Sequence, residues 1–67
     1  MKATEEDVKK LMDGEEHRIK WYCTDEKEMF EADVIYSNAS SRFEMEDVSG
    51  GFEFNCDYND MLDCLRL

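Results

Sequence analysis

Near its start the chain shows an apolar pattern typical of a short helix. Three apolar residues recur at positions i, i+3 and i+4: Val8, Leu11 and Met12. This spacing places them on one narrow face of a helix. Thr4 is a favourable N-cap and Asp7, three residues later, occupies the acidic position of a capping box. Gly14 can adopt the positive φ that ends a helix. The pattern predicts a helix over roughly Glu5–Asp13.

From His17 onward the apolar residues alternate with polar ones, which is the period of half-buried strands. Three segments show this alternation: His17–Thr24, Met29–Tyr36 and Ser41–Val48. The residues that share the apolar side are Ile19, Trp21, Cys23, Phe30, Ala32, Val34, Tyr36, Phe43 and Met45. Charged or turn-forming residues separate the segments. We therefore predict an antiparallel meander with one apolar face and one polar face.

The C-terminal part of the chain predicts a turn, an extended segment and a second helix. Ser49-Gly50-Gly51 has the composition of a hairpin turn. Phe52–Cys56 alternates again and is interpreted either as a fourth strand or as an extended arm. Helical spacing then returns at Tyr58, Met61, Leu62 and Leu65, preceded by Asp57 or Asn59 as the N-cap.

These elements predict an α+β fold in one small domain over residues 1–67. It consists of a short N-terminal helix, a three- to four-stranded antiparallel sheet and a C-terminal helix, with the helices covering the apolar face. A chain of 67 residues is long enough for one small domain. No apolar run approaches the length of a membrane span. The charged segment Met1–Asp13 is unlike a signal peptide, so we expect a cytoplasmic protein.

The charge is strongly negative and unevenly distributed. Asp and Glu number 18 and Lys and Arg number 8, a formal net charge of -10. Residues 21–67 hold twelve acidic and three basic residues, and 43–65 holds seven acidic and no basic ones. Soluble surfaces usually intersperse the two signs. An acidic chain is repelled by nucleic acids and anionic membranes, so the expected partner is a basic protein.

Acidic residues also recur at regular spacing within the predicted elements. Carboxylates two residues apart on one strand face lie about 6.6–7 Å apart. This is comparable with the path between successive phosphates, which rise about 3.4 Å per step while winding around the axis. Acidic residues three apart form a further row on the last helix. The candidate partner-binding residues are Glu31, Asp33, Glu44, Glu46, Asp57 and Asp60. A surface that serves solubility alone is the alternative.

The sequence offers little catalytic, metal or cofactor chemistry. His17 is the only imidazole, and it lies about 20 Å from Cys23 along one predicted strand, too far for one metal ion to bind both. Three cysteines without a CxxC pair indicate reduced, apolar residues rather than a disulfide framework. We therefore expect no catalytic residues, no metal and no cofactor, and we do not expect an enzyme.

In element order and acidity, the whole chain resembles small acidic proteins that bacteriophages and mobile elements use to inhibit host DNA-binding enzymes. Type II anti-CRISPR proteins are among them, and some have a helix, a three-stranded sheet and a C-terminal helix. The resemblance implies a DNA mimic whose Asp and Glu side chains occupy a basic nucleic-acid groove in a bacterial host cell. An RNA-guided CRISPR nuclease is the first target to expect. The alternative is an acidic regulatory or antitoxin-like subunit that binds a basic protein outside any DNA site.

Overall fold

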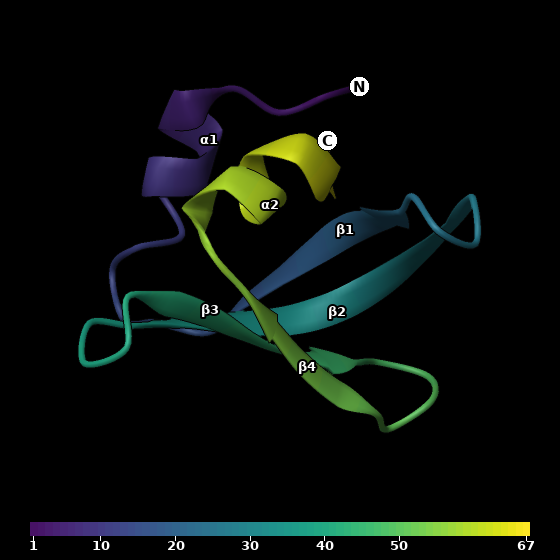
Figure 1. The fold of residues 1–67 in the computed structure, drawn as a ribbon. Coiled ribbons are helices and arrows are strands. Elements are labelled where there is room, and N and C mark those ends of the chain that lie inside the picture. Colours follow the sequence, from purple (N-terminus) through teal and green to yellow (C-terminus); the bar gives the residue numbers. More distant parts are fainter.

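The alternating segments of the chain join into one antiparallel sheet in the computed structural model, which describes residues 1–67. Its two helices and five strands are α1 (Glu5–Lys9), β1 (His17–Cys23), β2 (Glu28–Ser37), β3 (Arg42–Asp47), β4 (Glu53–Cys56), α2 (Tyr58–Cys64) and β5 (Leu65–Arg66). The strand order is β4-β3-β2-β1-β5. Both helices lie on one side of the sheet (Figure 1). The predicted α+β class and the antiparallel sheet are confirmed.

The strand number differs from the three to four that were predicted. Phe52–Cys56 contributes a true strand rather than an arm, because Phe54 pairs with Met45 and Cys56 with Phe43. The fifth strand, β5, lies where the sequence pattern predicts the last turn of the C-terminal helix. Leu65 instead adopts an extended conformation (φ -65°, ψ 132°) and pairs with Trp21 at the edge of β1. Two residues are too few to show an alternating pattern of their own, so tertiary pairing decides this element.

The first helix starts as predicted and ends earlier. Thr4 is the N-cap, and a complete capping box joins it to Asp7. The α-helix ends at Lys9 rather than near Asp13. Beyond it, the N–H of Leu11 bonds the carbonyl of Val8 at 3.0 Å, which is the tighter i to i+3 pattern of a terminal turn. Gly14 follows with a φ of 78° and allows the chain to turn toward β1.

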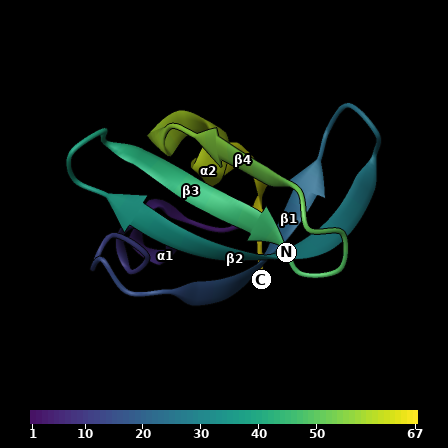
Figure 2. The ribbon, with the colours of Figure 1, turned by 90° about the horizontal axis from the view of Figure 1, so that it is seen from below.

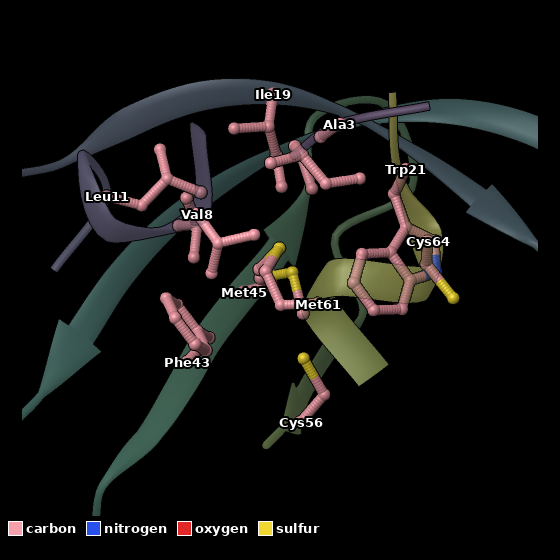
Figure 3. Packing of buried hydrophobic residues seen from close by; sticks show 13 residues of the cluster. Ala3, Val8, Leu11, Ile19, Trp21, Phe43, Met45, Cys56, Met61 and Cys64 are labelled. Atoms are coloured by element: carbon pink, nitrogen blue, oxygen red, sulfur yellow. The ribbon is translucent and has the colours of Figure 1, made fainter. Parts of the chain in front are cut away.

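The core lies between the helices and the sheet. It contains 13 buried residues, and the largest fully buried side chains are Phe43, Met61, Val8 and Val34. Figure 3 shows Val8 of α1 and Met61 of α2 meeting Phe43 and Met45 of β3. The predicted apolar face is therefore the face that the helices cover. Neither helix combines the length and the apolar character needed to cross a membrane.

The opposite side of the sheet, which we call the outer sheet face, is not covered by a helix (Figure 2). Antiparallel sheets commonly leave one face in contact with water in this way. Cross-strand pairing places polar side chains opposite one another on this face, for example Arg18 with Asp33 and Glu44 with Asn55. The candidate site is built on this polar face.

Candidate functional site

The strand register brings acidic residues from three strands into one row. Asp33 of β2 pairs with Glu46 of β3, and Glu46 pairs with Glu53 of β4. Residues that pair directly in an antiparallel sheet project from the same face. Glu31 lies two residues before Asp33 on β2, and Glu44 lies two residues before Glu46 on β3, so both project from the same face of the sheet as the row. We call these five residues, Glu31, Asp33, Glu44, Glu46 and Glu53, the acidic sheet face.

The only ion pair of the acidic sheet face lies along one of its borders. Arg18 Nε donates to Asp33 Oδ1 at 3.0 Å and Arg18 Nη2 donates to Asp33 Oδ2 at 3.3 Å. This forked hydrogen bond with Asp33 raises the pKa of Arg18. Lys20 of β1 pairs with Glu31 of β2. Basic residues thus compensate part of the charge on the β1 side.

The other border of the face has no such compensation. No ion pair reaches Glu44, Glu46 or Glu53. Arg42, which lies on β3 two residues before Glu44, donates through Nε to Asn55 Oδ1 at 2.7 Å instead. All three carboxylates therefore remain exposed and available to an external cation.

The sheet is hollowed where these carboxylates converge. A shallow depression of about 220 Å³ is lined by Glu16, Asp33, Ile35, Glu44, Met45, Glu46 and Glu53. A neighbouring depression of about 320 Å³ lies between Arg42, Glu44, Glu53 and Asn55. An ammonium or guanidinium group entering either depression meets carboxylates on adjacent strands. The arrangement suits several Lys or Arg side chains from one surface.

The two acidic residues predicted on the C-terminal helix do not join this face. Met61 and Cys64 of α2 are buried against the helix-covered side of the sheet, so the exposed Asp60 lies on that side. Asp57 is the N-cap of α2, and its Oδ1 accepts the backbone N–H of Asp60 at 2.9 Å. The structure thus gathers Glu31, Asp33, Glu44 and Glu46 and separates Asp57 and Asp60 from them.

Glu53 also belongs to the acidic sheet face, although it is not among the candidate residues predicted from the sequence. The alternation of Phe52–Cys56 already places Glu53 and Asn55 on the polar side of a possible strand. The same segment could equally have been an arm without a sheet partner. Only the pairing of Glu53 with Glu46 shows that it belongs with the other carboxylates.

Other reactive side chains have local partners or are buried. His17 Nε2 lies 2.9 Å from Asp13 Oδ1, and this contact, with the N–H of Glu15, lowers the pKa of Asp13. All three cysteines are free, and burial raises the pKa of Cys56 to about 12. No three His, Cys, Asp or Glu side chains are arranged to hold a metal ion.

Comparisons with protein-family models, with curated proteins and with solved structures found no match to this chain. The fold and the acidic sheet face are the observations from which its function is inferred. The acidic sheet face says more about function than the fold does, because small α+β domains serve many unrelated functions.

Proposed function

We propose that this protein is an acidic inhibitor that acts in the bacterial cytoplasm on a nucleic-acid-binding enzyme. Its acidic sheet face occupies the basic groove of the enzyme in place of DNA phosphates. An RNA-guided CRISPR nuclease is the first target to test, and a bacteriophage is the expected source of such an inhibitor. The protein itself is not an enzyme in this proposal and needs no cofactor.

The observation that supports this proposal most strongly is the pairing of Glu46 with Glu53, two like charges directly opposite each other that have no ion-pair partner. Like charges directly opposite each other on neighbouring strands destabilise a sheet. A solubility role does not require them to be adjacent, since dispersed charges keep a protein soluble equally well. Adjacent carboxylates do strengthen the binding of closely spaced cations, so a binding role gives a reason for an arrangement that opposes folding.

The geometry suits the Lys and Arg side chains of a groove that normally binds phosphates. Neighbouring strands are about 4.7–4.9 Å apart, and residues two apart on one strand are about 6.6–7 Å apart along the backbone. Glu46 and Glu53 are paired on neighbouring strands, and Glu44 and Glu46 are two residues apart on β3. Close charge pairs across interfaces couple by about 1.5–7 kcal/mol. Opposite charges also accelerate the encounter, and salt screens this acceleration.

Charge reversal on the acidic sheet face provides the test. The double variant Glu46→Lys/Glu53→Lys should weaken inhibition at least about tenfold, which corresponds to about 1.4 kcal/mol. The matched control Glu6→Lys/Asp63→Lys changes the net charge equally at exposed positions on the two helices, which lie on the other side of the sheet, and should inhibit nearly as well as the wild type. The assay is competition with DNA for the enzyme that the protein captures from a nuclease-treated bacterial lysate.

Two outcomes would contradict DNA mimicry. In one, the protein and DNA bind the enzyme simultaneously without weakening each other, and the regulatory-subunit interpretation then replaces mimicry. In the other, the control double variant loses as much inhibition as Glu46→Lys/Glu53→Lys. That result would show that net charge alone, and not the row on the sheet, determines binding.

A further inference from the structure

One end of the molecule carries an aromatic cluster on the helix-covered side of the sheet. The turn between β1 and β2 and the turn between β3 and β4 both lie at this end (Figures 1 and 2). Four aromatic side chains from three strands and the second turn form the cluster: Trp21, Phe30, Phe52 and Phe54. Most of the core is buried, whereas Phe52 remains largely exposed.

Ring contacts hold this cluster in a defined arrangement. The ring of Phe54 meets Trp21 edge-on, with centroids 5.5 Å apart, and meets Phe30 edge-on at 5.9 Å. Phe52 stacks on Phe54 at 5.6 Å and contacts Phe30 at 5.9 Å. Edge-to-face and offset-stacked rings at these separations attract one another beyond the area that they bury. The four rings are therefore preorganised, which lowers the entropy cost of binding a ligand.

Hydrogen bonds around the β3–β4 turn hold the backbone of Phe52 in place, although its side chain is exposed. The buried carboxylate of Asp47 accepts the backbone N–H of Ser49 at 3.0 Å and its hydroxyl at 3.2 Å. The backbone N–H of Asp47 bonds the carbonyl of Phe52 at 3.0 Å. Phe52 nevertheless remains 51% exposed. Aromatic residues, Phe among them, are enriched at protein–protein interfaces, so an anchored and exposed Phe52 suits a binding role.

The cluster borders an open hollow of about 350 Å³, which we call the aromatic hollow. Its lining is Trp21, Cys23, Thr24, Asp25, Glu26, Phe30, Phe52, Phe54 and Cys64. The wall is thus mainly apolar, while the β1–β2 turn contributes two carboxylates at the rim. Glu28 adds a further acidic residue next to this turn, and Lys27 is its only base. The hollow combines an apolar wall with a predominantly negative rim.

We propose that the aromatic hollow binds an apolar side chain, preferably aromatic, from a protein segment in which Lys or Arg flanks that side chain. The apolar side chain packs on Phe52 and Phe54, and the flanking cations meet Asp25 and Glu26. Cations near aromatic faces gain additional stabilisation. This inference goes beyond the proposed function, because the hollow lies on the opposite side of the sheet from Glu44 and Glu46.

Titration with the peptide acetyl-Lys-Arg-Phe-Lys-Arg-amide tests this inference on the full chain. Trp21 is the only tryptophan and lines the hollow, so its fluorescence reports occupancy. We expect a saturable change together with NMR amide shifts centred on Phe30, Phe52 and Phe54. The variant Phe52→Ser and, separately, a peptide with Ser in place of Phe should each weaken binding about fivefold or more. The double variant Asp25→Asn/Glu26→Gln should weaken it about threefold.

Matched variants on the outer sheet face serve as controls. Ile35→Ser removes an apolar side chain that is 41% exposed and should leave peptide binding unchanged. Glu44→Gln/Glu46→Gln removes two charges and should likewise leave it unchanged, even if this variant loses the proposed inhibition. Circular dichroism of every variant confirms that each one is folded.

Three results would overturn the inference. Absence of saturable binding up to about 1 mM peptide would exclude the site. Equal weakening by Glu44→Gln/Glu46→Gln and Asp25→Asn/Glu26→Gln would indicate general charge attraction. Self-association that sedimentation detects and Phe52→Ser abolishes would identify the occupant as a second copy of this chain rather than a basic partner.

Discussion

Individual aspartates in this chain have different roles, which their surroundings decide. Asp47 is buried at 9% exposure and orders a turn through Ser49, so it does not contribute to the exposed charge. Asp57 caps a helix through the N–H of Asp60. Asp33 is held by the guanidinium of Arg18. Net charge therefore overstates the number of carboxylates that are free to bind a partner.

The cysteines show the same dependence on surroundings, and this leads to a prediction about thiol reactivity. Burial raises the pKa of Cys56 to about 12, from an ordinary value of 9.0, so the reactive thiolate becomes about a thousandfold rarer near neutral pH. Burial also raises the pKa of Cys64. Cys23 is only half-buried. At pH 7.5, iodoacetamide should label Cys23 first and leave Cys56 and Cys64 protected.

Mass spectrometry of the alkylated protein measures this order of labelling. Labelling in 8 M urea is the control, and there all three cysteines should react. Equal rates for Cys23 and Cys56 in the native protein would contradict the burial of Cys56 against β3.

Among the elements, α2 connects the core to the sheet edge. It has seven residues, too short to be stable in isolation, so packing must hold it. Met61 supplies this packing with no exposed surface, and the N-cap Asp57 satisfies one of the free N–H groups at the helix start. The chain then passes directly into β5, where Leu65 pairs with Trp21.

Truncation of the Met61 side chain should therefore destabilise the whole domain. Met61→Ala should lower the free energy of unfolding by about 2–5 kcal/mol, because it removes buried methylenes and leaves a cavity. The matched variant Met29→Ala, at a position that is 54% exposed, should change it by less than about 0.5 kcal/mol. Urea unfolding followed by circular dichroism measures both changes. A loss below about 1 kcal/mol for Met61→Ala would contradict the observed packing.

Across the whole molecule, the outer sheet face is divided by charge. Arg18 and Lys20 lie on β1 with Arg66 on the neighbouring β5, whereas the unpaired Glu46 and Glu53 lie on β3 and β4. Electrostatic repulsion is thus concentrated in one half of the sheet rather than spread over the surface. Salt should relieve this repulsion, since the screening length is about 10 Å at 0.1 M ionic strength.

A single neutral substitution at the centre of the row tests this view. Glu46 faces Asp33 on one side and Glu53 on the other. At low salt, Glu46→Gln should stabilise the protein by about 0.2–1 kcal/mol, and its melting temperature should rise less with added NaCl than that of the wild type.

Thermal melts between about 20 and 300 mM NaCl measure both effects. Glu6→Gln, in the first turn of α1, is the control. It should destabilise slightly, because a negative charge favours a helix N-terminus. A lower melting temperature for Glu46→Gln at low salt would show that the row is not repulsive.

The periods of the sequence by themselves determined the element types and the faces of the strands. A period of 3.6 marks one face of a helix and a period of two marks alternate faces of a strand, so spacing along the chain is enough to assign Val8, Phe43 and Met45 to the core. The capping box at Thr4 was equally local, because its partners are three residues apart. These features depend on neighbours along the chain, and the sequence contains those neighbours.

Only the tertiary structure decided the register of the strands and which residues from distant parts of the chain are neighbours. Alternation indicates that Glu53 and Glu46 are both on polar faces, but the strand partner and its offset depend on packing of the whole core. Register therefore created the acidic row and added Glu53 to it. The burial of Met61 placed Asp60 on the other side of the sheet, and pairing with Trp21 made Leu65 a strand residue. In each case the deciding partner is remote in sequence, so no local pattern could specify it.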